Sequence, residues 1–152
     1  MNAPERLSHI SSDTLYLADT HEVINVGHEL VDHNAFEQDA ALVEGVRQHG
    51  GDWALPELSA FGRLTGSADY IELGALANRH PPELDTHDRF GRRVDLVRFH
   101  PAYHALMKTA IEHGLHASPW SEPRPGAHVA RAARTYLQTQ VEAGHGLSLI
   151  HI

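Results

Sequence analysis

The stretch VRFHPAYH, residues 97–104, marks the point where an extended segment passes into a helix. Proline suits the first turn of a helix, because the amide hydrogen that it lacks would have no partner there. The pattern predicts a helix that begins at Pro101, with His100 as its cap and His104 packed half-buried one turn later. Apolar residues follow at helical spacing: Tyr103, Leu106, Met107, Ala110 and Ile111.

The two histidines of this stretch raise the question of a metal site. Histidines four residues apart lie on one face of a helix, which is a spacing that zinc sites use. A zinc site also needs a third protein ligand, and nothing in the sequence fixes Asp95, His113 or His116 beside His100 and His104. We interpret the pair as structural and keep a histidine-rich metal-binding module as the alternative.

The other candidate motifs are incomplete. A zinc-protease helix needs His-Glu-x-x-His, but HEVIN at 21–25 and HELVD at 28–32 lack the second histidine. The sequence contains no strand–serine–helix elbow and no glycine-rich phosphate loop. Glu112 and Glu142 are lone carboxylates on predicted helices. We therefore assign no catalytic, cofactor-binding or metal-binding residue.

Apolar spacing, caps and breakers predict four further helices. The first spans about 34–49, with Asn34 as its cap, and ends at two glycines. Asp52 caps the second helix. The third spans 67–79 and ends before two prolines. The last helix begins near Gly126.

The rest of the chain is extended or irregular. Residues 83–99 have a turn signal near Asp88 and alternating apolar side chains, which predicts a short hairpin. Residues 118–126 contain three prolines and are predicted to form a loop. Residues 1–33 have no sustained period and are expected to form an extended arm. The fold class is therefore mainly α, with about five helices, one short hairpin and an N-terminal arm.

Composition narrows the function classes. The chain has 152 residues, 41% of them hydrophobic, with no cysteine and a formal net charge of −8. This acidic balance disfavours nucleic-acid binding by the chain alone. Two arginine clusters, 89–93 and 131–134, are the local exceptions, and a solvated face is the favoured interpretation of both. Trp53 and Trp120 are expected to be packing anchors. The sequence shows neither a signal peptide nor a run long enough to span a bilayer, so we expect a cytoplasmic protein without membrane contact.

Four longer stretches carry a resemblance to a known family. They are LYLADTHEVIN at 15–25, GRLTGSADYIELGALANRHPPEL at 62–84, DRFGRRVDLVRFHPAYHALM at 88–107 and GAHVARAARTYLQTQVEAG at 126–144. Together they resemble the N-terminal portion of the AidB-type adaptive response proteins, a branch of the acyl-CoA dehydrogenase superfamily. The resemblance covers about residues 15–146, in order and at family spacing.

The resemblance implies a function for a longer parent protein. Such parents contain FAD, assemble as homotetramers, take part in the DNA alkylation damage response and resemble acyl-CoA dehydrogenases. They bind double-stranded DNA through a C-terminal domain. The resemblance also implies a fold of a helical N-terminal domain, a β-barrel and a helical bundle, so the partners of this chain would be the other domains of the parent and neighbouring subunits.

The resemblance also implies a division of the chain. We expect the arm at 1–33, an incomplete helical domain at 34–146, and a tail at 147–152 that does not match the family. Such a piece would scaffold the flavin and acyl-CoA cleft, hold no cofactor and be inactive by itself. An independent helical interaction domain is a further alternative.

Overall fold

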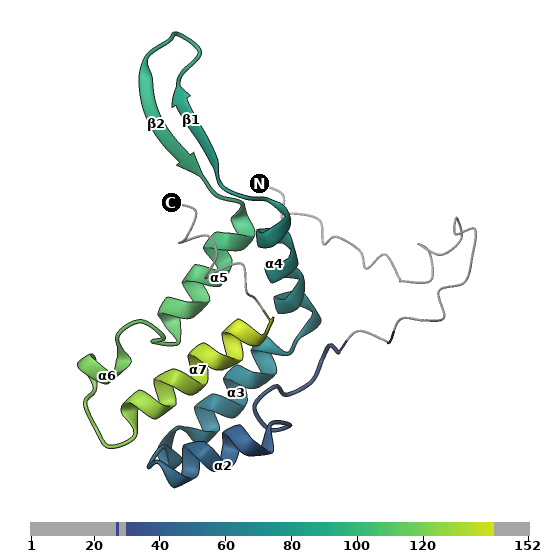
Figure 1. The fold of residues 1–152 in the computed structure, drawn as a ribbon, viewed down its shortest axis with the longest axis vertical. Coiled ribbons are helices and arrows are strands. Elements are labelled where there is room, and N and C mark those ends of the chain that lie inside the picture. Colours follow the sequence, from purple (N-terminus) through teal and green to yellow (C-terminus); the bar gives the residue numbers. More distant parts are fainter. Residues whose placement is uncertain (1–26, 28–29, 142–152) are drawn as a thin grey trace, which may run out of the picture.

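The computed structural model describes residue 27 and residues 30–141 (Figure 1). Most of the predicted arm at 1–33 and the whole predicted tail at 147–152 lie outside the described residues, as do the HEVIN stretch and Glu142. The end of the arm that is described is anchored, because the amide of His33 donates to the carbonyl of Gly66 at 3.2 Å.

The mainly helical fold class is confirmed (Figure 1). The described helices are α2 (Ala40–Gln48), α3 (Leu55–Thr65), α4 (Ala68–Arg79), α5 (Pro101–Glu112), α6 (Ser118–Ser121) and α7 (Ala127–Val141), with a 3-10 turn η2 (Asp52–Ala54) before α3. The strands are β1 (Glu83–His87) and β2 (Arg93–Arg98). No helix in the described part of the chain is both long and apolar enough to cross a membrane.

Two predicted helix starts are confirmed at atomic detail. The hydroxyl of Ser67 accepts from the amide of Tyr70 and caps α4. The Nδ1 atom of His100 accepts from the amide of Ala102 at 3.2 Å, and Pro101 opens α5. Both caps lie in the extended region of backbone space, as N-caps require.

Three predicted boundaries were wrong, each because a short local structure intervenes. Asn34 caps a turn rather than a helix, and Asp39 caps α2 through the amide of Leu42. Asp52 lies inside η2, so α3 begins only at Leu55. The predicted loop at 118–126 contains the four-residue helix α6, which a proline in its first turn permits.

The core lies between α3 and α7, with α2 packed beside them (Figure 1). Its largest fully buried apolar side chains are Phe61, Leu58, Leu137 and Val46, and Leu106 on α5 is buried outside this cluster. Gly62 on α3 lets the chain at Phe36 approach closely, since a Cβ on Gly62 would lie 2.5 Å from the Phe36 Cβ. Absence of a side chain there thus fixes the segment before α2 against α3.

The predicted hairpin is confirmed, and it projects from the helical body (Figure 1). β1 and β2 are antiparallel, with Leu84 opposite Val97 and a bulge between Asp85 and His87. Every residue of β2 is exposed. A two-stranded hairpin is marginally stable without packing, so this element depends on its two junctions with α4 and α5.

Candidate functional site

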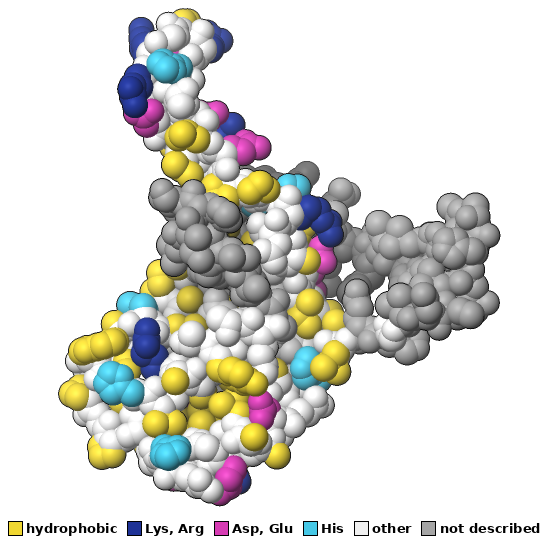
Figure 2. All heavy atoms as spheres, in the orientation of Figure 1, with side chains coloured by type: hydrophobic (Ala, Val, Ile, Leu, Met, Phe, Trp, Pro, Cys, Tyr) yellow, Lys and Arg dark blue, Asp and Glu magenta, His cyan; other side chains and the backbone are white. Residues whose placement is uncertain are grey.

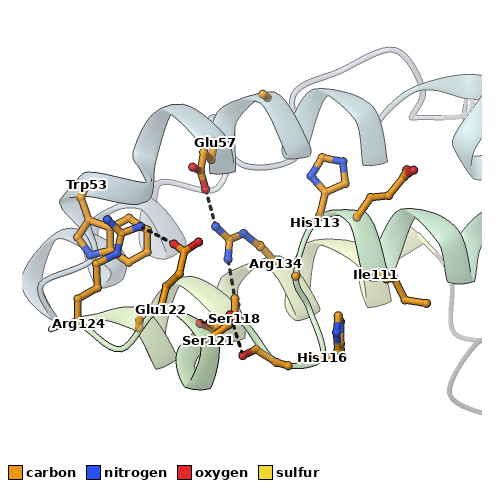
Figure 3. Close-up of a pocket in the computed structure, with 15 residues that line it drawn as sticks. Trp53, Glu57, Ile111, His113, His116, Ser118, Ser121, Glu122, Arg124 and Arg134 are labelled. Atoms are coloured by element: carbon orange, nitrogen blue, oxygen red, sulfur yellow. Dashed lines mark hydrogen bonds and ion pairs between the residues drawn. The ribbon is translucent and has the colours of Figure 1, made fainter.

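A polar cavity with a volume of about 560 Å³ opens between α3, the α5–α6 connection and the start of α7 (Figure 3). Its lining is mixed, with apolar and small residues beside seven carboxylates, arginines and histidines: Glu57, Glu112, Glu122, Arg124, Arg134, His113 and His116. Volumes of this size accept small molecules or side chains of a partner protein. The polar groups at its floor therefore decide what the cavity can do.

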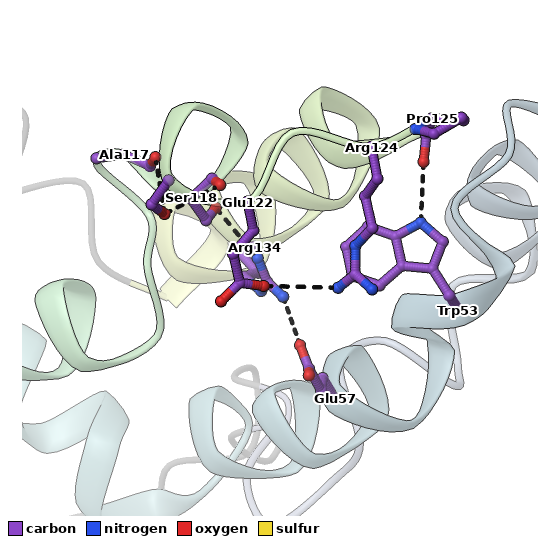
Figure 4. Close-up of polar contacts among 9 residues, drawn as sticks. Trp53, Glu57, Ala117, Ser118, Glu122, Arg124, Pro125 and Arg134 are labelled. Carbon is purple, nitrogen blue, oxygen red and sulfur yellow. Dashed lines mark hydrogen bonds and ion pairs between the residues drawn. The ribbon is translucent and has the colours of Figure 1, made fainter.

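Arg134 is the central polar group of the cavity (Figures 3 and 4). Its guanidinium donates to the Glu57 carboxylate at 2.6 Å and to the Ser118 hydroxyl at 3.4 Å, and its side chain is only 8% exposed. Burying a cation is costly unless it is paired and hydrogen-bonded. Arg134 thus joins α7 to α3 and α6 through contacts that satisfy its charge.

A second arginine on α7 also binds the protein itself. The Nε of Arg131 donates to the Leu115 carbonyl at 2.6 Å. The interpretation of the 131–134 cluster as a solvated face was therefore wrong. The spacing contained the signal, because Arg134 lies four residues after Ala130 and three before Leu137, both of which are buried.

Trp53 lines one end of the cavity (Figure 3). Its indole N–H donates to the Pro125 carbonyl at 3.0 Å, and the Arg124 guanidinium lies 3.2 Å from the centre of its ring. This contact confirms Trp53 as a packing anchor. The same prediction for Trp120 was wrong, since Trp120 is 66% exposed on the short surface helix α6, where Pro119 takes the buried position.

His113 lies at the inner wall of the cavity (Figure 3). Its ring centre is 4.7 Å from that of Phe61. Partial loss of solvent around the ring lowers the pKa of His113 below its ordinary value of 6.5, and the nearby Arg134 cation lowers this pKa further. The Glu112 and Glu57 carboxylates act in the opposite direction. The net effect lowers the pKa of His113 and favours the neutral form of its ring.

The histidines of VRFHPAYH are not brought together with a third ligand. His100 is a helix cap, stacked on His80 with ring centres 4.6 Å apart. His104 is exposed rather than half-buried, because α5 buries Ala102 and Leu106, two residues to either side. Within the described residues, no group of three histidine, aspartate or glutamate side chains is placed to hold a metal ion.

The polar contacts of the cavity join α7 to α3 and α6. Ser118 has a hydroxyl that faces the cavity residues, and this hydroxyl accepts a hydrogen bond from Arg134. Among the described residues, no histidine is hydrogen-bonded to it. Glu57 is tied to Arg134. The sequence had pointed to neither Glu57 nor Ser118, since only the fold brings them to α7, and no local pattern marks them.

The comparisons with known proteins are consistent with this geometry. Residues 25–150 match the family model of the adaptive response protein AidB N-terminal domain. The chain is 47% identical over 126 residues to an Escherichia coli (strain K12) protein named as the acyl-CoA dehydrogenase AidB, over 82% of this chain and 23% of that protein.

Two solved structures share the fold. The apo-form of Bd2924 superposes with a TM-score of 0.67 and 26% identity, over 78% of this chain and 24% of that one. Caenorhabditis elegans ACDH-11, solved with C11-CoA, gives a TM-score of 0.67 at 20% identity, over 87% and 23%. The chain therefore spans about a quarter of the length of each of these relatives.

Proposed function

This chain belongs to the AidB N-terminal domain family of acyl-CoA dehydrogenase-like proteins, and we propose from that premise that it is the helical scaffold of a longer FAD protein. In this role it forms one wall of the flavin and acyl-CoA cleft and contributes subunit contacts. The parent is a cytoplasmic homotetramer of the DNA alkylation damage response. The chain by itself carries out no chemistry.

The observation that carries the proposal is that the polar side chains of Arg134, Arg131 and Trp53 all bond to atoms of the protein itself. Arg134 and Arg131 hold α7 against neighbouring elements. Trp53 bonds to the Pro125 carbonyl, just before α7 begins. Such contacts make a rigid wall, whereas a catalytic site needs polar groups that point at a reacting molecule.

The described cavity suits FAD poorly. The cofactor has a pyrophosphate with two negative charges, which binds to arginines, backbone amides or a helix N-terminus. The two arginines of the cavity wall are already paired, Arg134 with Glu57 and Arg124 with Glu122, while the carboxylates of Glu57, Glu112 and Glu122 are all more than half exposed. These carboxylates would repel the pyrophosphate, so the proposal places flavin contact in other domains of the parent.

The charge of the chain supports the same division for DNA. A net charge of −8 opposes the approach of phosphates. The proposal therefore places double-stranded DNA on a C-terminal domain of the parent.

An exchange experiment tests the scaffold role. In the Escherichia coli relative, the N-terminal segment is replaced by residues 25–150 of this chain. We expect the chimera to purify with bound yellow flavin and with the same assembly as the unmodified relative. A folded chimera that loses its flavin would contradict the proposal.

The isolated chain provides the complementary test. It is expected to purify without a flavin spectrum and to show no acyl-CoA-dependent dye reduction. A flavin spectrum or acyl-CoA-dependent dye reduction in the isolated chain would contradict the proposal, because it would show that flavin binding or the reaction does not depend on other domains.

A further inference from the structure

The tip of the hairpin presents an ordered aromatic and cationic group. The Phe90 ring is 65% exposed, with the Arg89 guanidinium 4.5 Å and the Arg92 guanidinium 5.5 Å from its centre. The Asp88 carboxylate accepts from the amides of Phe90 and Arg92 and fixes the turn. Among the described residues, neither Arg89 nor Arg92 has a carboxylate partner.

The charge of the chain is unevenly distributed between the hairpin and the body. Residues 83–98 contain four arginines and four carboxylates and carry no net charge, whereas the described residues 30–82 and 99–141 together carry a net charge of −3. The turn itself, residues 88–93, has three arginines and one aspartate and carries a charge of +2. A positive tip and a negative body attract one another in two copies of the same chain.

The cavity between α3, α5 and α7 offers a place for this tip. Its mouth exposes the carboxylates of Glu57, Glu112 and Glu122, and the apolar side chain of Ile111 is 54% exposed beside them. Two arginines also line it: Arg134 is buried beneath Glu57, and Arg124 is 44% exposed in a pair with Glu122, so the lining keeps a net charge of −1. A phenyl ring between two guanidiniums is complementary to a hollow of mixed lining whose excess charge is negative.

Geometry decides between the chain's own cavity and that of a neighbour. The hairpin projects from one end of the molecule, while α6 and the start of α7, which form the cavity, lie at the other end (Figures 1 and 2). An arm therefore cannot reach its own cavity. In a two-fold arrangement of antiparallel copies, each tip would meet the cavity of the other copy, and the contact would occur twice.

We propose that the β1–β2 hairpin is an exchange arm, whose Phe90 tip enters the cavity between α3, α5 and α7 of a second copy of this chain. The inference rests on the subunit contacts of the proposed function and names the surface that makes them. An arm laid against a neighbour also covers Leu84 and Val97, which share one face of the hairpin and are largely exposed.

Disulfide trapping tests the pairing, because the natural chain contains no cysteine. Phe90→Cys places a thiol at the tip, and Ala60→Cys places one at an exposed position in the cavity wall. Under mild oxidation we expect a mixture of the two single variants to form a mixed disulfide dimer. The matched control is a mixture of Phe90→Cys with Gln48→Cys, which is exposed on α2 outside the cavity and should give little product.

A charge exchange tests the electrostatic part in solution. Sedimentation velocity of the natural chain should show a monomer–dimer equilibrium that weakens with added salt. Arg92→Glu should raise the dissociation constant by about five- to tenfold, since an attractive pair becomes repulsive at both reciprocal contacts. Adding Glu112→Arg to the same chain should restore most of the affinity.

The outcomes separate this inference from the proposed function. A chain that stays monomeric at all accessible concentrations, or equal disulfide trapping with Gln48→Cys, overturns the exchange arm. If the chimera still binds flavin in that case, the scaffold role stands, and the hairpin is covered by another part of the parent. If the chimera loses its flavin but the mixed disulfide forms, the exchange arm stands and the scaffold role is overturned.

Discussion

Arg134 on α7 donates to the Glu57 carboxylate on α3 at 2.6 Å, although 77 residues separate the two in sequence. The cation is buried while the carboxylate is 64% exposed. Because only one partner is desolvated, the two residues should respond differently to substitution.

One single and one double substitution test this asymmetry. Glu57→Gln leaves a buried cation without its counter-charge and should lower the free energy of unfolding by about 1–2 kcal/mol. Arg134→Met together with Glu57→Gln removes the buried charge as well, so the double variant should be more stable than Glu57→Gln alone. Urea denaturation measures both differences.

The control for this pair is the exposed contact between Lys108 and Glu112 at 3.7 Å. Lys108→Ala should change the stability by less than about 0.5 kcal/mol. If Glu57→Gln had no larger effect than Lys108→Ala, the brace would have no energetic role.

Two glycines on neighbouring helices provide a second matched test. A Cβ on Gly62 would lie 2.6 Å from the Asn34 Oδ1 atom, so Gly62→Ala should lower the unfolding free energy by about 1–3 kcal/mol. Gly45 lies inside α2, where an added Cβ would meet no atom within 4 Å, and Gly45→Ala should raise stability by up to about 1 kcal/mol. Thermal melts of the two variants should therefore shift in opposite directions.

Stability should depend on pH through His113. Its pKa is lowered in the folded state, so below the ordinary value of 6.5 the unfolded chain binds a proton that the folded chain does not. The contribution of His113 is fully present above pH 6.5 and is lost as the pH falls through its lowered folded-state pKa. His113→Gln should reduce the slope of melting temperature against pH below 6.5. An NMR titration in which the His113 ring titrates at or above 6.5 would contradict this prediction.

The cap at the start of α5 should tolerate one substitution and not another. His100 accepts from the Ala102 amide at 3.2 Å, and asparagine can make the same contact. His100→Ala should lower the free energy of unfolding by about 1 kcal/mol. His100→Asn should leave the free energy of unfolding, measured by urea denaturation, close to that of the natural chain. Equal losses in the two variants would show that the ring stacked on His80 matters more than the cap.

Local signals in the sequence predicted several elements correctly. Ser67 and the pair His100–Pro101 marked the starts of α4 and α5, and turn residues with alternating side chains marked the hairpin. These predictions succeeded because capping and turn chemistry act between residues that are neighbours in sequence.

The candidate site could not be predicted in the same way. Glu57, Ser118 and Arg134 come from three separate elements, and helical spacing indicated the burial of Arg134 without indicating its partners. The two tryptophans illustrate the same limit, since their sequence neighbours gave no reason why Trp53 packs and Trp120 is exposed.

The sequence by itself determined the family, the helical class, the starts of α4 and α5 and the position of the hairpin, because these depend on short-range backbone chemistry and on motif order. Only the tertiary structure decided which charges are buried, which aromatic rings pack and that the hairpin extends away from the body. Those properties depend on contacts between segments far apart in the chain, and the solvation of a side chain such as Arg134 is set by all of these segments together.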